Sequence, residues 1–141
     1  DKNSPDAVPI EWLQKINQED YITWEPYNDN VVDYLRKIDI FVLPTYYPEG
    51  LPKSLLEAAA MGLPLISTNT PGCNEIVKDG INGFLVTIKD NYQLAEKMYN
   101  LSEDYKLRFK MGIESRKIVE KKFDVNVVNR KTIDIYKNMR L

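Results

Sequence analysis

The sequence predicts an α/β fold, a Rossmann-like parallel sheet flanked by helices, and two observations predict it. Apolar runs typical of strands alternate along the chain with segments whose apolar residues recur at helical spacing. The run IFVLP at 40–44 is apolar throughout, as in strands that are buried on both faces of a parallel sheet. Alternation of this kind favours crossover connections, so we expect parallel strands covered by helices.

Four strands are expected in order along the chain, at residues 21–24, 40–44, 64–68 and 83–86. The apolar residues between 31 and 38 recur at helical spacing and place a helix before the second strand. The next helix is expected to start at Pro52, whose missing N–H group costs nothing in a first turn, and to end before Gly62. A short turn around NEIVKDG at 74–80 precedes the last strand.

Three helical segments are expected after the sheet. The first opens at Asp90, with Gln93 placed to complete its cap. The second opens near Ser102, and the third follows Asp124. No repeat, low-complexity tract or linker interrupts the 141 residues, so we expect one domain.

The composition excludes several classes of protein. The chain has one cysteine, Cys73, and no histidine, which excludes an internal disulfide, Cys-His or Ser-His-Asp catalysis, and zinc sites with histidine ligands. No apolar run reaches the roughly eighteen residues of a membrane span. The polar start DKNSPDAVP lacks the features of a signal peptide, so we expect a soluble, cytoplasmic protein.

The net charge of −2 hides an asymmetry along the chain. Residues 1–50 carry ten acids and four bases, whereas residues 101–141 carry eleven bases and six acids. Seven of these bases lie between Lys106 and Lys122 on an expected helix. One interpretation is a solvated helix face, and the other is a surface for anionic lipid or a phosphorylated substrate.

Two glutamates stand out near the predicted site. Ligands of open parallel sheets bind beyond the carboxyl ends of the strands, so the loops after Pro44 and Thr68 should carry the chemistry. Glu49 lies in the first of these loops, and Glu57 lies inside the helix that follows it. A carboxylate only accepts hydrogen bonds, which suits the adjacent hydroxyls of a sugar or a ribose. The alternative is that Glu57 is a surface residue that pairs with a base such as Lys53.

The loop TNTPGCNE at 68–75 brings Gly72 to the start of a short helix, where free N–H groups and the helix dipole favour an anion. Neither the dinucleotide fingerprint nor the P-loop is present, and Pro-Gly is also an ordinary turn. Together with the two glutamates, the loop indicates a ligand that has both phosphate and sugar, as a nucleotide sugar does.

The stretch 39–86 contains VLPTYYPEGLP, LLEAAAMGLPLIST, PGCNEIV and DGINGFLV in order. It resembles the C-terminal donor-binding domain of GT-B glycosyltransferases of the GT4 type, particularly bacterial enzymes of capsular and exopolysaccharide synthesis. The Glu-x7-Glu motif of that family falls on Glu49 and Glu57. The resemblance implies that residues 1–141 are a truncated C-terminal nucleotide-sugar-binding domain, from which the first strand region and the N-terminal domain are absent.

The resemblance also implies an activity: retaining transfer of a sugar from a nucleotide diphosphate sugar to an acceptor hydroxyl in polysaccharide or glycolipid synthesis. It implies no metal and no cofactor besides the donor substrate. The implied partners are a saccharide or lipid-linked acceptor and the missing N-terminal domain, with no nucleic acid, and the implied place is the cytoplasm at the inner face of the membrane. We expect the isolated fragment to be inactive.

Site residues are implied in three groups. Glu49 would be the catalytic residue and would contact the donor sugar, together with the backbone of Gly50 and Leu51. Glu57 would bind the ribose hydroxyls. The other implied residues form a loop beside the diphosphate and a loop beside the nucleobase, namely Thr70, Gly72 and Cys73 in the first and Trp24, Pro26 and Tyr27 in the second.

Two alternatives remain at this stage. A noncatalytic nucleotide-binding module would have the same sequence features. A receiver-like signalling domain would have the same alternating layout, but it needs a phosphoacceptor aspartate at the end of a strand, and FVLPT at 41–45 ends in proline and threonine. Tyr46 and Tyr47 either line an acceptor cleft or pack beside the buried strand.

Overall fold

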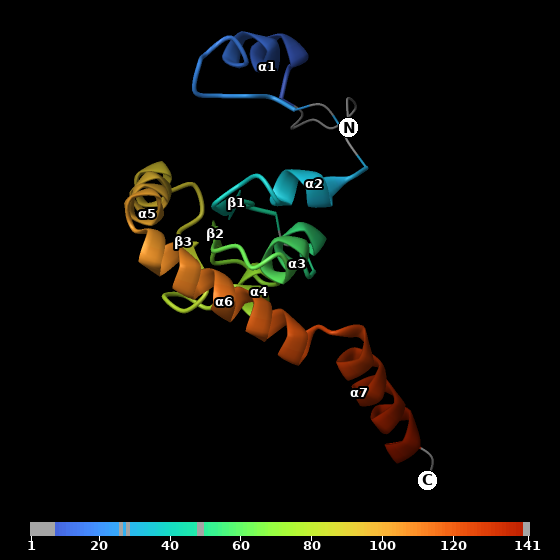
Figure 1. Cartoon of the computed structure of the whole chain (residues 1–141). Helices are drawn as coiled ribbons and strands as arrows, with labels where there is room; N and C mark the ends of the chain where they lie inside the picture. The colour runs from blue at the N-terminus through green and yellow to red at the C-terminus, as the bar shows by residue number, and fades with distance from the viewer. Residues whose placement is uncertain (1–7, 26, 28, 48–49, 140–141) are drawn as a thin grey trace. The chain divides into compact units, whose positions relative to one another are not determined.

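The structure is a computed structural model of the chain, and it describes residues 8–25, 27, 29–47 and 50–139 (Figure 1). The chain consists of two units, residues 1–31 and residues 32–141. Helix α1 (Ile10–Ile16) lies in the first unit. Glu11 in its first turn and Lys15 in its last turn complement the helix dipole. No helix was predicted at this position.

The prediction of a strand at 21–24 is wrong. These four residues are exposed and form no β ladder with any described residue. The backbone N–H of Trp24 instead donates to Asn17 Oδ1 at 2.5 Å. Strand propensity measures how well side chains pack on a paired, half-buried sheet, and 21–24 has no such sheet to join.

The sheet of the second unit contains three parallel strands, β1 (Phe41–Leu43), β2 (Leu65–Thr68) and β3 (Gly83–Val86), in the order β1-β2-β3. Val42 lies opposite Ile66, and Ile66 lies opposite Phe84. The three later strand predictions and their parallel arrangement are therefore confirmed. Because the strands are parallel, their carboxyl ends meet at one edge of the sheet.

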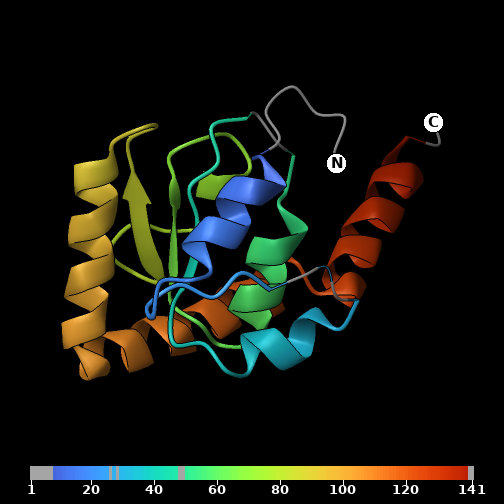
Figure 2. The same cartoon turned by 90° about the horizontal axis from the view of Figure 1, so that it is seen from above.

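Helices precede, connect and follow these strands. They are α2 (Val31–Leu35), α3 (Lys53–Ala60), α4 (Cys73–Ile76), α5 (Asn91–Glu103), α6 (Tyr105–Lys122) and α7 (Val125–Asn138). Seen from above, α3 and α5 flank the strands on opposite sides (Figure 2). Asp90 and Asp124 cap α5 and α7, as predicted, although the Gln93 side chain accepts from the Thr87 N–H and not from Asp90. Pro52 occupies the N-cap position of α3, one residue before the first turn in which it was expected, and its side chain makes no capping bond.

The start of α6 differs from the prediction. It begins at Tyr105, because Asp104 Oδ1 accepts a hydrogen bond from the Leu107 N–H at 2.9 Å. Ser102 lies inside α5, and its hydroxyl donates to the carbonyl of Tyr99 at 2.8 Å. Both residue types favour helix starts, and the aspartate, which makes the capping bond, sets the boundary.

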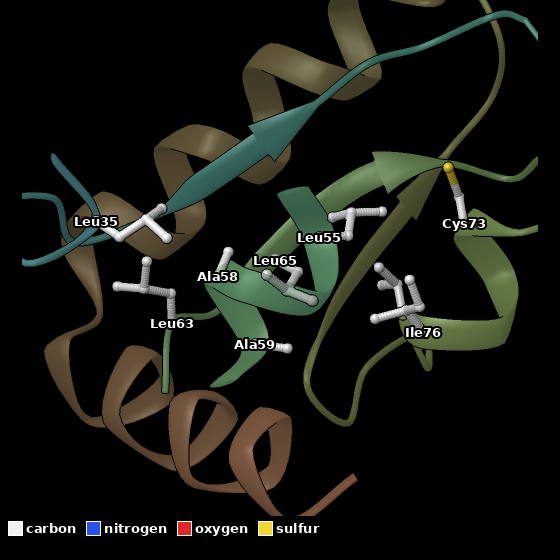
Figure 3. Close-up of a cluster of buried hydrophobic side chains, with 9 residues drawn as sticks. Leu35, Leu55, Ala58, Ala59, Leu63, Leu65, Cys73 and Ile76 are labelled. Atoms are coloured by element: carbon white, nitrogen blue, oxygen red, sulfur yellow. The ribbon is translucent and has the colours of Figure 1, made fainter. Parts of the chain in front are cut away.

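Side chains on the two faces of the sheet enter two separate cores. Leu65 on β2 packs in the first core with fully buried residues of α3 and α4, which include Leu55, Ala58, Ala59, Cys73 and Ile76 (Figure 3). Ile66, the next residue of β2, packs in the second core with Leu101 of α5 and Met111 of α6. This alternation buries β2 on both faces. The prediction of burial on both faces concerns 40–44 and is wrong there, because β1 lies at the edge of the described sheet and its three residues are only partly buried.

Gly112 fixes the crossing of α6 over the end of α3. It is buried, and a Cβ atom added to it would lie 2.1 Å from the carbonyl oxygen of Gly62. Gly62 itself has φ +75°, which other residues rarely adopt. A side chain at position 112 would therefore force the backbone at Gly62 and the backbone at Gly112 apart, which would move α3 away from α6.

We expect Gly112→Ala to lower the free energy of unfolding by about 1–3 kcal/mol, because the added methyl group overpacks the crossing. At an exposed helix position the same change would be stabilising by about 0.5–1 kcal/mol, so the sign of the effect tests the contact. Urea unfolding measures it, with Lys121→Ala on the exposed side of α6 as the control that should stay within about 0.5 kcal/mol of the parent. A neutral or stabilising Gly112→Ala would contradict the close approach.

Candidate functional site

The carboxyl edge of the sheet brings three loops together, after β1, β2 and β3. A cavity of about 200 Å³ lies at this edge and contacts all three strand ends. It is lined by Pro44, Tyr46, Thr68, Val86, Thr87, Lys89, Asp90, Asn91 and Leu94. The structure thus places the loops that the sequence singled out at the same edge of the sheet.

Hydroxyl groups of β2 tie its end to the end of β1. Ser67 Oγ donates to the carbonyl of Leu43 at 2.8 Å, and Thr68 Oγ1 donates to the carbonyl of Thr45. Both side chains are buried, so their hydrogen bonds are satisfied where water does not compete. These two bonds fix the start of the loop that leads to Glu49, and the sequence analysis missed them.

Glu57 lies on the second turn of α3, between the fully buried residues Leu55 and Ala58. Its side chain is 35% exposed, and Oε1 lies 3.5 Å from Nζ of Lys53, which is 88% exposed. The structure therefore contains the ion pair between Glu57 and Lys53 that the sequence analysis named as the alternative. An exposed pair of this spacing contributes only about 0.3–0.5 kcal/mol, so ligand hydroxyls can replace the lysine at little cost.

Glu49 lies outside the described residues, so its catalytic and sugar-binding role stays a prediction. Gly50 and Leu51 follow it, and a Cβ atom added to Gly50 would meet no described atom within 4 Å. Leu51 is half exposed, whereas Pro52 is buried at the start of α3. The backbone beside Glu49 is thus open to a ligand at Gly50 and anchored at Pro52.

The loop after β2 contains an unsatisfied polar group. Thr70 is 3% exposed, and its Oγ1 is buried without a hydrogen-bond partner among the described residues. The Thr70 backbone is fully used, since its N–H donates to the Thr68 carbonyl at 2.8 Å and its carbonyl accepts from the Asn74 N–H at 3.1 Å. A buried hydroxyl in this state costs about 1–3 kcal/mol and keeps an unused hydrogen-bonding capacity beside the loop.

The other two residues predicted in this loop differ in what they offer. Gly72 precedes α4 with φ +89°, a conformation that glycine adopts without strain. Cys73 is fully buried in the core beneath the loop. Its thiol packs with Leu55 and Ile76 and not in the cavity, so only the backbone of Cys73 is placed to serve a ligand.

A third wall of the cavity contains Lys89, which the sequence analysis missed, and Tyr46, which it expected either to line a cleft or to pack beside the strand. Nζ of Lys89 lies 5.2 Å from the centroid of the Tyr46 ring, and this ring lies 4.4 Å from the ring of Tyr47. Lys89 has φ +62°, and the following Asp90 caps α5 by accepting from the Gln93 N–H. A lysine three residues after β3, in a loop at the ligand edge, is the signal that could have indicated it.

The predicted nucleobase loop belongs to the first unit. Trp24 is 38% exposed and Tyr27 is 91% exposed, and the Tyr27 hydroxyl donates to Asp29 Oδ1 at 2.7 Å. Pro26 lies outside the described residues. The contact of this loop with a nucleobase stays a prediction.

Few electrostatic features stand out elsewhere. Across the described ranges, no three cysteine or carboxylate side chains gather as ligands for a metal ion. The Lys97 ammonium donates to Glu96 and lowers the pKa of that exposed carboxyl on α5, outside the three loops. No helix in the part of the chain that the structure describes is long and apolar enough to cross a bilayer.

Comparison with known proteins gives one consistent family. The family model described as "Glycosyl transferases group 1" matches residues 6–118. The Campylobacter jejuni N,N'-diacetylbacillosaminyl-diphospho-undecaprenol alpha-1,3-N-acetylgalactosaminyltransferase is 33% identical over 107 residues, 76% of this chain and 28% of that protein. The Staphylococcus aureus capsular polysaccharide biosynthesis glycosyltransferase CapM is 33% identical over 128 residues, 84% of this chain and 33% of that protein.

The fold of the chain also matches solved structures. Anabaena HepE, crystallised in complex with UDP, superimposes with a TM-score of 0.83 at 20% identity, over 92% of this chain and 36% of that one. The GT-B fold expected from the sequence is thereby confirmed. The chain spans about a third of the length of the relatives it matches.

The unsatisfied hydroxyl of Thr70 gives a stability prediction. We expect Thr70→Val to leave the free energy of unfolding unchanged or to raise it by up to about 1 kcal/mol, because it replaces a buried orphan hydroxyl by a methyl group of the same shape. Thr68→Val is the matched control, since the Thr68 hydroxyl is buried and bonded to Thr45, and it should be destabilising by about 1 kcal/mol. Equal losses in urea unfolding would show that the Thr70 hydroxyl has a partner after all.

Proposed function

The chain belongs to the group 1 glycosyl transferases, and from that premise we propose that the complete protein transfers a sugar from a nucleotide diphosphate sugar to an acceptor hydroxyl. Two observations beside neighbouring strands carry the proposal: the half-buried carboxylate of Glu57 on the helix that follows β1, and the buried, unsatisfied hydroxyl of Thr70 in the loop that follows β2. Glu57 accepts hydrogen bonds from the ribose hydroxyls, and Thr70 donates one to a diphosphate oxygen. A nucleotide sugar contains both partners.

In the proposed reaction, the bond between the anomeric carbon and the diphosphate oxygen breaks, and the diphosphate leaves with the electron pair. The acceptor oxygen bonds to the same face of the anomeric carbon, so the configuration is retained, and the proton of the acceptor hydroxyl passes to the departing diphosphate oxygen. Negative charge grows on the diphosphate, where fixed donors such as the Thr70 hydroxyl and the loop backbone at Gly72 stabilise it most. Positive charge grows at the sugar, where we place the carboxylate of Glu49 as the catalytic residue, with Gly50 and Leu51 beside the sugar hydroxyls. The proposal includes no metal and no cofactor.

We extend the proposal to the complete protein. Residues 1–141 form the partial C-terminal donor domain, and a separate N-terminal domain binds the acceptor, which agrees with a chain about a third as long as its relatives. The acceptor is a saccharide or a lipid-linked saccharide, and the names of two relatives include a diphosphoundecaprenol. The place of action is the cytoplasmic face of the membrane, and nucleic acid has no part.

Donor binding by the chain tests the site. In heteronuclear NMR titrations with UDP, GDP, ADP and their glucose or mannose conjugates, we expect one base to shift the resonances of residues 50–57 and 69–75. Glu57→Ala should weaken binding about tenfold or more, because it removes charged hydrogen bonds of about 1.5–3 kcal/mol. Lys53→Ala is the matched control: it breaks the same ion pair but leaves the carboxylate, so binding should stay equal or tighten. Equal affinity of the parent and Glu57→Ala would contradict the ribose assignment.

Turnover separates the enzyme from a noncatalytic binding module. In the complete protein, we expect Glu49→Gln to lower kcat by about a hundredfold or more, because it removes a charge that acts on the transition state. The 141-residue chain alone should release no nucleotide diphosphate from the donor, since the proposed acceptor-binding domain is not part of it. Chromatography measures the nucleotide diphosphate that is released. An unchanged kcat of Glu49→Gln would contradict the catalytic role, and release of nucleotide diphosphate by the 141-residue chain would contradict its expected inactivity.

A further inference from the structure

Helix α6 has one side in the core and one side in solvent. Met111, Gly112 and Ser115 are buried against the sheet and α3. The opposite side carries residues three and four positions apart, which share one helix face. We call this the α6 outer face, and its residues are Lys106, Phe109, Lys110, Ile113, Lys117 and Lys121.

Two large apolar side chains lie in the middle of the α6 outer face. Phe109 is 60% exposed and Ile113 is 42% exposed. A surface hollow of about 310 Å³ runs beside them, and its floor includes Gly62 and Gly112, where α6 crosses the end of α3. The Phe109 ring stacks at 6.2 Å on Tyr105, which is itself 67% exposed, so these rings extend the apolar strip along the helix.

The lysines of this face are in excess over their partners. Lys117 pairs with Glu114 at 2.7 Å, but Lys106, Lys110 and Lys121 form no ion pair or hydrogen bond with any described residue. The nearby acid Glu120 is already paired with Arg116 at 2.5 Å. The α6 outer face therefore carries free positive charge, although the chain as a whole has a net charge of −2.

We propose that the α6 outer face binds the anionic surface of a lipid bilayer. The lysine ammonium groups contact lipid phosphates while their alkyl stems, Phe109 and Ile113 enter the boundary between headgroups and acyl chains. Nucleic acid fits this face less well, because exposed apolar groups between the lysines gain nothing from a phosphate backbone. The inference extends the proposed membrane location by naming the surface, and it rests on α6 and not on the donor site.

This placement leaves the donor site accessible. The hollow beside Ile113 includes Gly62, which follows the carboxyl end of α3, whereas the sugar loop leads into the other end of α3 at Pro52. The eight residues of α3 separate these ends by about 12 Å. A membrane at the α6 outer face therefore contacts the end of α3 that is remote from the loop after β1.

Co-sedimentation with vesicles tests the inference. The probes are vesicles of phosphatidylcholine alone and vesicles in which about a third of the lipid is phosphatidylglycerol. The 141-residue chain should bind the anionic vesicles and not the neutral ones, and added salt should weaken the binding. Lys106→Glu with Lys110→Glu should weaken binding about 30-fold or more, since each basic group near the surface contributes about fivefold.

The matched control is Arg130→Glu with Lys131→Glu on α7, which changes the net charge by the same amount at two other exposed positions. It should weaken binding less than about threefold, because only the general charge of the chain changes. Equal loss in the two double variants would overturn the assignment to α6, and so would equal binding of the parent to neutral and anionic vesicles or to neither.

The apolar part of the face is tested with Phe109→Ser and Ile113→Ser, which keep every charge. We expect about tenfold weaker vesicle binding from each, and both variants should remain folded, because neither side chain belongs to the two buried cores. Parent-like vesicle binding by both, together with tight binding of a short RNA, would overturn the lipid proposal in favour of a general polyanion site. These variants lie outside the proposed donor site, so they should bind nucleotide with the affinity of the parent. Failure of the lipid proposal can therefore be told apart from failure of the donor-site proposal.

Discussion

The buried side chain of Asn82 is the interaction on which the sheet depends. Its Oδ1 accepts from the Lys78 N–H at 2.7 Å, and its Nδ2 donates to the Ile76 carbonyl at 3.2 Å. Its own carbonyl accepts from the Leu65 N–H at 3.1 Å and from Ser115 Oγ at 3.2 Å. One fully buried residue thus joins the loop after α4, the start of β2 and the middle of α6. Networks of this kind are stabilising only when every polar group is satisfied, and here the described bonds use both side-chain ends.

The polar groups at the two edges of the sheet differ in whether their hydrogen bonds are satisfied. At the amino edge, Asn82 and Ser115 satisfy each other and the backbone. At the carboxyl edge, Ser67 and Thr68 bind the loop after β1, but the Thr70 hydroxyl has no described partner and Glu57 has only an exposed lysine. A rigid, satisfied edge holds the strands in register, so the unsatisfied groups at the other edge are presented in fixed positions. This contrast is what makes the carboxyl edge suitable for a ligand.

The parts of the fold that the sequence predicted depend on local signals. The strand at 40–44 is a continuous apolar run, those at 64–68 and 83–86 are short and mainly apolar, and Asp90 caps a helix with its own side chain, so neighbours in sequence suffice. The strand at 21–24 failed because a strand needs a partner, which composition does not reveal. In the site, the sequence placed Glu57 inside the helix after Pro52, but it did not decide whether Glu57 pairs with Lys53. The orphan state of Thr70 could not be predicted, since it depends on which distant groups fail to reach a hydroxyl.

The arginines and the lysines of the basic C-terminal part of the chain have different roles in the structure. On α6, the arginines bind carbonyl groups at helix ends: Arg108 Nη1 donates to the Leu101 and Ser102 carbonyls at 2.5 and 2.6 Å, and Arg116 Nη1 donates to the Ala60 carbonyl. A planar guanidinium has several fixed donors and suits this structural use. Lysines also serve it, since Lys78 Nζ donates to the Asn74 carbonyl of α4 at 2.7 Å, but no described lysine of the α6 outer face does so. A count of bases between Lys106 and Lys122 treats both types alike. Once the arginines are assigned to helix ends, the charge left for a partner belongs to lysines, and their spacing on the exposed side of α6 gives the helix its basic, partly apolar surface.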